Sequence, residues 1–184
     1  MINEFINIVY RSTRFDKNFY SNSKNFDEAA IYFAAIIVIV VGILGIIPQA
    51  AILEFYRNNF NVDVPTTKLK YILIVSIFIW IIRSIYIFIV GIKLFPSKKT
   101  NCNLLKVFTL VGFAHSPYIF RLIAFSNELV LPVIILTEIL YHISLIVGTN
   151  EILNYKNIFK SFMVIEFPLI LLIIYTFFKL EIVF

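Results

Sequence analysis

The feature that most constrains this chain is a series of long apolar runs, at about residues 29–53, 71–94, 104–125, 129–148 and 160–180. A helix needs roughly 20 apolar residues to cross the hydrocarbon layer of a bilayer, and each run has about that length. A water-soluble domain of 184 residues could not bury them all, because 60% of the chain is hydrophobic and only 15% is charged. The sequence therefore predicts an all-α integral membrane protein, a single domain over residues 1–184 with a bundle of five transmembrane helices.

A segment of mixed polarity, residues 1–28, precedes the first apolar run. Its apolar residues recur at helical spacing: Ile2, Phe5, Ile6 and Val9. A basic stretch follows them: Arg11, Arg14 and Lys17. This pattern predicts an amphipathic helical arm on the cytoplasmic side. We expect the arm either to lie in the membrane interface, with its basic residues near lipid phosphates, or to dock on the surface of the bundle.

The basic residues beside the spans indicate the orientation of the chain. Lys and Arg near the span ends are more numerous on the side that holds the N-terminus. Because cytoplasmic loops carry an excess of Lys and Arg, we expect the N-terminus in the cytoplasm and the C-terminus on the opposite side. The net charge of +5 has the same explanation, since basic flanks attract anionic headgroups. The lipid bilayer is thus the expected partner of these residues, and nucleic acid is not.

Ionisable residues inside the apolar runs are costly and need partners within the bundle. When depth is counted at 1.5 Å per residue from the middle of each run, Arg83, His115 and Glu138 share the midplane. His142 and Glu166 both fall roughly 6 Å toward the cytoplasmic side, because their helices run in opposite directions. The sequence therefore predicts two pairs, Arg83 with Glu138 and His142 with Glu166.

Three interpretations of this set remain open. It can be a buried network that fixes which helices are neighbours, or a path for protons or ions along Glu, His and Arg. A metal site built from His115, Glu138, His142 and Glu166 is the third, although no ligand spacing typical of a metal motif is present. The sequence also holds no nucleophile motif and no glycine-rich phosphate loop. We therefore expect a protein that is not an enzyme and that has no cofactor and no metal.

The third run contains a proline near its middle. No formal charge lies between Lys106 and Arg121, and we expect a helix from about 104 to 125 whose two basic ends snorkel, with a re-entrant hairpin as the alternative. Pro117 cannot donate a hydrogen bond to the carbonyl of Phe113 and should bend this helix.

Small and polar residues surround Pro117. The freed carbonyl needs a partner, which His115 or Ser116 can provide, and Gly112 with Ala114 allows another helix to approach closely. These residues predict a kinked and tightly packed centre of the bundle.

The run LLKVFTLVGFAHSPYIFRLIAF resembles the third span of the Yip family, the Ypt/Rab-interacting membrane proteins and their bacterial relatives, with Gly112, Ala114 and Pro117 matching a Gly-x-Ala-x-x-Pro-like pattern. The opening VYRSTRFDKNFYSNSKNFDEAA is similar to the lead-in of prokaryotic, especially cyanobacterial-type, members. The resemblance implies five spans, a non-enzymatic role, and a prokaryotic cell membrane or a thylakoid-type membrane. The Asp-Leu-Tyr-Gly-Pro-like motif of the trafficking members is missing, so a Rab-type GTPase partner is not implied.

Two functions from different classes follow. We expect a scaffold or adaptor that binds another membrane protein or a second copy of itself, with the cytoplasmic arm and the basic loops as the contact surface. The alternative is a small proton or ion transporter, or a channel subunit, that uses the intramembrane Arg, Glu and His residues. A dry, fully paired cluster would favour the first function, and a cavity lined by these side chains would favour the second.

Overall fold

The computed structural model describes residues 2–22, 26–45, 71–97, 100, 102–124 and 127–168, and the regular secondary structure of these residues is entirely helical. The elements are α1 (Ile2–Thr13), α2 (Lys17–Ser21), α3 (Ala30–Leu44), α5 (Ile72–Ile89), a π-helical turn (Val90–Leu94), α6 (Leu104–Ala114), a 3-10 helix (Ser116–Ile123) and α7 (Asn127–Ile152). Residues 158–168 are also helical.

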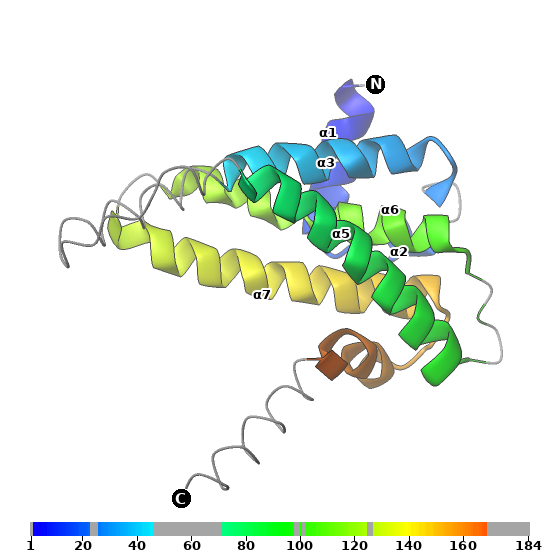
Figure 1. Cartoon of the computed structure of the whole chain (residues 1–184). Helices are drawn as coiled ribbons and strands as arrows, with labels where there is room; N and C mark the ends of the chain where they lie inside the picture. Colours follow the sequence, from blue (N-terminus) through cyan, green and yellow to red (C-terminus); the bar gives the residue numbers. More distant parts are fainter. Residues whose placement is uncertain are drawn as a thin grey trace, which may run out of the picture.

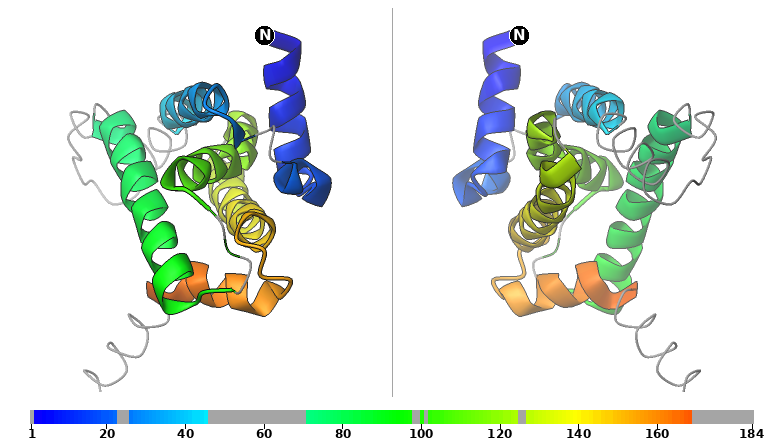
Figure 2. Two further views of the ribbon diagram at one scale, coloured as in Figure 1. Left: turned by 90° about the vertical axis from the view of Figure 1, so that its right-hand side faces the viewer. Right: turned by 90° about the vertical axis from the view of Figure 1, so that its left-hand side faces the viewer.

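The helix α6 is the centre of the fold. It packs against α3, α5 and α7, and every residue from Thr109 to Ala114 is buried. Figure 1 shows α3 and α6 running in one direction and α7 running back beside α6. A side view shows α5 on one flank of α6 and the N-terminal helices on the other (Figure 2). Such a helix must be apolar on all sides, which explains the composition of the third run.

Two helices of the described chain are long and apolar enough to cross a membrane. They cover Ile72–Leu94 and Glu128–Ile152, and α3 is a shorter apolar helix. They coincide with the second and fourth predicted runs. The predicted first and fifth spans continue into residues 46–53 and 169–180, which lie outside the described residues. In the part of the chain that it describes, the structure therefore shows regular secondary structure that is all helical and two helices of membrane-crossing length.

The helix predicted over 104–125 ends at Ala114 and continues as the 3-10 helix, so the prediction of one α-helix is wrong there. Pro117 is the reason, because it has no N–H for the carbonyl of Phe113. The hydroxyl of Ser116 donates to that carbonyl at 2.7 Å, which confirms the prediction that a neighbouring polar group would satisfy it. The ring nitrogen Nδ1 of His115 lies 2.6 Å from the carbonyl of Val111.

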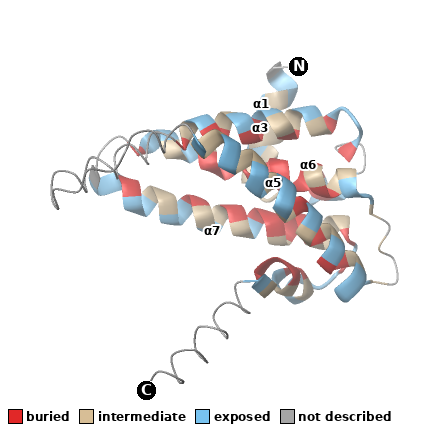
Figure 3. Cartoon of the chain, in the orientation of Figure 1, coloured by how far each residue is buried: buried red, intermediate tan, exposed pale blue. Residues whose placement is uncertain are grey.

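The end of the N-terminal arm is docked on the bundle. Ser12 is fully buried, and its hydroxyl donates to the hydroxyl of Ser116 at 2.8 Å. The side chains of Phe19 and Tyr20 in α2 are also buried, and the Tyr20 hydroxyl lies 2.6 Å from that of Ser144 on α7. Figure 3 shows the buried residues concentrated where the elements meet, with blue, exposed positions toward the tip of α1. Two locations were possible for the arm, the membrane interface and the surface of the bundle. This part of the arm lies on the surface of the bundle.

The basic residues of the arm differ in their contacts. Arg11 forms an ion pair with Asp16 at 2.7 Å, and its guanidinium lies over the ring of Phe19. The hydrogen bond from Arg11 holds the pKa of the Asp16 carboxyl below its ordinary value. Arg14 and Lys17 are exposed, and Arg14 donates to the hydroxyl of Tyr10. Two of the three predicted basic contact residues, Arg11 and Arg14, therefore have partners within the arm itself.

Candidate functional site

The ionisable residues that the sequence places inside the spans come from four parts of the fold. Arg83 lies on α5, His115 at the end of α6, Glu138 and His142 on α7, and Glu166 in the helix over residues 158–168. Two hydrogen bonds help to hold these elements in place. The hydroxyl of Tyr86 on α5 donates to the carbonyl of Val164, and the side-chain oxygen of Asn157 accepts from the backbone N–H of Phe159 where the last helix begins.

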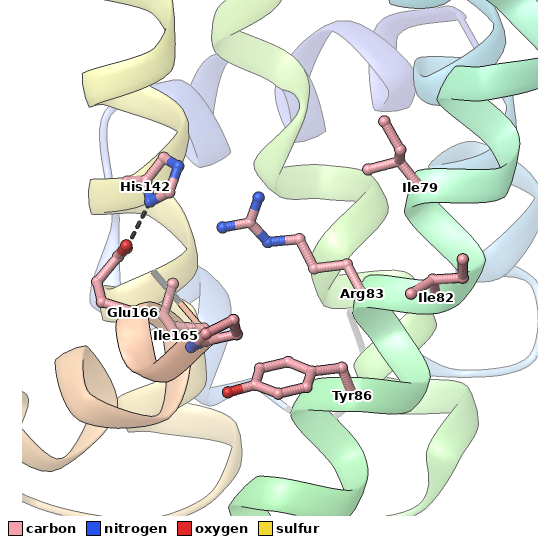
Figure 4. A pocket seen from close by; sticks show the side chains of 8 residues that line it. Ile79, Ile82, Arg83, Tyr86, His142, Ile165 and Glu166 are labelled. Atoms are coloured by element: carbon pink, nitrogen blue, oxygen red, sulfur yellow. Dashed lines mark hydrogen bonds and ion pairs between the residues drawn. The ribbon is translucent and has the colours of Figure 1, made fainter. Parts of the chain in front are cut away.

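His142 and Glu166 are in contact, as the depth count predicts. Nδ1 of His142 lies 2.5 Å from Oε1 of Glu166, and Glu166 is only 7% exposed. Figure 4 shows this contact on one wall of a pocket, with Arg83 reaching from the opposite wall toward His142. At this distance the two atoms share a hydrogen bond, whose proton belongs either to the imidazole ring or to the carboxyl group.

Glu138 has a different partner from the predicted one. Its carboxylate accepts from Nη2 of Arg121 at 2.7 Å and from the hydroxyl of Tyr118 at 2.8 Å. The pair of Glu138 with Arg83 is therefore a wrong prediction. The 3-10 helix is the physical reason, because residues three apart in such a helix lie on the same side. Tyr118 and Arg121 are three apart, and both face α7.

Arg83 has no acidic partner among the described residues. Its guanidinium carbon lies 4.9 Å from the centre of the Tyr141 ring, a cation–π contact. Tyr141 is buried at 2% exposure, and its hydroxyl finds no hydrogen-bond partner in the described part of the chain. A permanently charged guanidinium and an unpartnered hydroxyl thus lie together at the level of the predicted midplane.

His115 is enclosed by aromatic rings. Its ring centre is 4.8 Å from that of Tyr141 and 5.6 Å from that of Tyr118, with edge-to-face geometry in both cases. The side chain is 5% exposed, and its Nδ1 already faces the carbonyl of Val111. His115 therefore belongs to the same cluster as Arg83 and Glu138, but aromatic rings and not hydrogen bonds connect it to them.

Two cavities adjoin this cluster. A cavity of about 240 Å³ is lined by these residues: Val41, Gly45, Ile72, Ser76, Ile79, Arg83, His115, Tyr118, Arg121, Glu138 and Tyr141. A larger and more open one of about 610 Å³ is lined by Ile79, Ile82, Arg83, Tyr86, His142, Ile165, Glu166 and Pro168. Arg83 and Ile79 line both cavities. Arg83 therefore stands where the two spaces meet, with ionisable groups on either side of it.

Three members of the cluster are missing from the sequence-based set. The sequence pattern does not indicate Tyr118 or Tyr141 as site residues, and it places Arg121 at the end of a span. The spacing of Tyr118 and Arg121 after Pro117 is the signal that could have found two of them, because a proline favours a change of helix type. In the described residues, no three His, Cys, Asp or Glu side chains converge in a group that could hold a metal ion.

The small residues of the family-like motif are in packing contacts. Gly112 lies against Ala34 of α3, and a Cβ atom on residue 112 would stand 2.5 Å from the Cβ of Ala34. Ala114 and Pro117 are buried next to the arm and the cluster. In the described structure these residues shape the place where α3, α6 and the 3-10 helix meet.

Comparisons of the chain with protein-family models, with curated proteins and with solved structures found no match.

Proposed function

We propose that this chain is an integral membrane protein that moves protons or small ions across the bilayer, as a small transporter or as a channel subunit. The observation that carries the proposal is the position of Arg83. This charge has no acidic partner among the described residues, and it lies at the junction of two cavities that also adjoin the two ionisable pairs. A purely structural network would be dry and fully paired. Here the charged groups adjoin space that is large enough for solute or water.

The finer membrane arrangement belongs to this proposal. Five spans, an N-terminus in the cytoplasm and a C-terminus on the opposite side follow from the apolar runs and the basic flanks. Membership of the Yip family is proposed from the resemblance around Gly112 and Pro117, and a prokaryotic or thylakoid-type membrane from the resemblance of the opening segment. In support, one face of α5 carries exposed large apolar side chains, for example Ile74 at 61% and Phe78 at 63%, as a lipid-facing helix would.

Reconstitution in liposomes tests the transport function. Liposomes that hold the purified chain and an internal pH-sensitive dye should take up protons after an external acid pulse, in chloride or in lactate salts, faster than empty liposomes. Glu166→Gln removes the carboxylate of the His142 pair and should lower the proton uptake at least tenfold. Glu4→Gln, on the exposed face of α1, is the matched control and should behave as the wild type. Equal uptake by wild-type and empty liposomes would reject the function.

An adaptor that binds another membrane protein or a second copy is the second candidate. The observation that favours it is the apolar face of α5, which no other described element covers (Figure 3). The docked end of the arm counts against the version in which the arm is the contact surface, because Ser12, Phe19 and Tyr20 are already buried in the chain itself. Crosslinking from a cysteine placed at Phe78 in native membranes tests it. Retrieval of lipid alone would reject the adaptor.

A further inference from the structure

The charges around Arg83 can be counted, and the count depends on one proton. Charged and titratable groups face Arg83 from each packed element: Tyr86 on α5, His115, Tyr118 and Arg121 from α6 and the 3-10 helix, Glu138, Tyr141 and His142 on α7, and Glu166. The Arg121–Glu138 pair is neutral as a unit. His115 and the three tyrosines are counted as neutral. Among the described residues, the remaining charge is therefore set by Arg83 and by the His142–Glu166 pair.

The His142–Glu166 pair has two relevant charge states. When it holds two protons, as an imidazolium with a carboxylate or as an imidazole with a carboxylic acid, the pair is neutral and the charge of Arg83 is uncompensated. When it loses one of them, the pair carries one negative charge and balances Arg83. Because isolated charges are costly in a low-dielectric site, the protonated state calls for an anion and the deprotonated state does not.

The surroundings of Arg83 indicate the kind of anion. A single guanidinium compensates one charge, and its planar fork matches the two oxygens of a carboxylate. Tyr141, 2% exposed, provides a second donor beside it, because its hydroxyl has no hydrogen-bond partner among the described residues. The larger cavity has apolar walls from Ile79, Ile82 and Ile165, which fit an apolar body attached to the carboxylate (Figure 4).

We propose that Arg83 and Tyr141 form a binding site for a monocarboxylate with an apolar body, and that this anion binds together with one proton held by the His142–Glu166 pair. The inference rests on the proposed transport function and names its substrate class, a proton with a carboxylate. The carboxylate can come from two sources, a soluble short-chain acid or a fatty acid of the bilayer, which share the same head group. Binding of one carboxylate together with one proton adds no net charge to the site.

Trp80 provides the readout for a binding experiment. It is the only tryptophan of the chain and lies three residues before Arg83 on α5, so both side chains lie on neighbouring faces of one helix. Butyrate is titrated into the purified full-length chain in detergent between about pH 6 and pH 8, and dodecanoate is titrated in nanodiscs. We expect a saturable change in Trp80 fluorescence on binding. The apparent affinity for the carboxylate should fall by up to about tenfold for each unit by which the pH rises, which is the limit for one linked proton. Butyramide, which is uncharged and of similar shape, should give no saturable change.

Four variants sharpen the test. Arg83→Gln should weaken binding at least tenfold, and Tyr141→Phe, which keeps the aromatic ring, should weaken it threefold to tenfold. Glu166→Gln removes the group that gives the pair a negative charge, so at about pH 8 it should bind at least as tightly as the wild type does at acid pH. Arg14→Gln, on the exposed arm, is the control and should bind as the wild type does. The Glu166→Gln result separates an electrostatic role from a loss of folding, because binding is retained.

Either butyrate or dodecanoate as the better ligand supports the site and identifies the source. Equal signals from butyrate and butyramide, unchanged binding in Arg83→Gln, or binding by Glu166→Gln at about pH 8 that is no tighter than that of the wild type would overturn the inference. Its failure can be told apart from failure of the transport function. Proton uptake without any carboxylate binding rejects this inference alone, and carboxylate binding without any uptake rejects transport alone.

Discussion

Gly112 of α6 lies directly against Ala34 of α3, and no side chain fits between the two backbones. A Cβ on residue 112 would stand 2.5 Å from the Cβ and 3.0 Å from the backbone oxygen of Ala34. Gly112→Ala should therefore lower the free energy of unfolding by about 1 to 3 kcal/mol, as overpacking does. Thermal unfolding in detergent, followed by circular dichroism, measures the change.

The matched control for this prediction is Gly42→Ala on α3. There the nearest atom is the flexible Cδ1 end of Leu73 at 3.0 Å, which can move aside. Alanine also has the higher helix propensity, by about 1 kcal/mol. Gly42→Ala should thus have the smaller effect. Equal destabilisation by both substitutions would mean that the contact between Gly112 and Ala34 is looser than the structure has it.

A double-mutant cycle tests the partner of Glu138. Arg121→Leu and Glu138→Leu should each destabilise the protein, because each leaves one charge of the pair without its partner. The double substitution should cost less than the sum by about 0.5 to 3 kcal/mol. The cycle of Arg83→Leu with Glu138→Leu should instead be additive within about 0.5 kcal/mol. Denaturation in mixed micelles measures both cycles, and a larger coupling for Arg83 would contradict the pairing.

Protonation of Asp16 at acid pH should release the N-terminal arm from the bundle. This carboxylate caps α2 by accepting from the backbone N–H of Asn18 at 2.9 Å, and it pairs with Arg11. Its pKa is lowered in the folded state, first by the hydrogen bond from Arg11, below the ordinary value of 3.8. A lowered pKa stabilises the docked arm above pH 3.8, and this stabilisation is lost as the pH falls through the lowered pKa.

Cleavage by pepsin beside Phe19 and Tyr20 reports this release, because both side chains are buried when the arm is docked. The rate relative to an unfolded substrate should rise from about pH 4 to about pH 2. Asp16→Asn keeps a capping side chain but loses the charge, so its cleavage should already be faster at about pH 4 and should change less. A wild-type rate that is independent of pH would show that Asp16 does not hold the arm.

The thiol of Cys102 should react slowly with alkylating reagents at neutral pH. Burial of the thiol in the segment before α6 raises its pKa to about 11. The nearby charge of Lys106 lowers the pKa, but by less than burial raises it. Since the thiolate is the reactive form, alkylation by iodoacetamide should accelerate by about tenfold per pH unit from about pH 7 up to about pH 10. N-acetylcysteine, with an ordinary pKa near about 8.5, should level off earlier. Levelling of the protein's rate at the same pH as the free thiol would contradict the burial.

Regular helices are where sequence reasoning succeeds. The depth count pairs His142 with Glu166 because both residues lie on continuous α-helix, where each residue advances by about 1.5 Å. Their contact at 2.5 Å agrees with that count. The satisfaction of the Phe113 carbonyl by Ser116 is likewise a local consequence of Pro117, which the sequence alone predicts.

The pairing of Glu138 could not be predicted by the same count. After Ala114 the chain advances by about 2.0 Å per residue and turns by a different angle, so Arg121 is displaced from its α-helical position. The docking of Phe19 and Tyr20 was equally undetermined, since an apolar helix face fits a lipid interface as well as a protein surface. The hydroxyls of Ser116 and Ser144 and the ring of Phe113 on the bundle are the contacts that place this part of the arm on the protein surface.

The sequence by itself determined that this chain is helical and apolar, which residues carry charge within it, and that Pro117 interrupts the third run, because these properties depend on composition and local backbone chemistry. The tertiary structure decided which charges meet. Contact between elements depends on helix rotation, helix type and packing of small residues such as Gly112 and Ala34, and these left Arg83 facing two cavities without a carboxylate partner among the described residues.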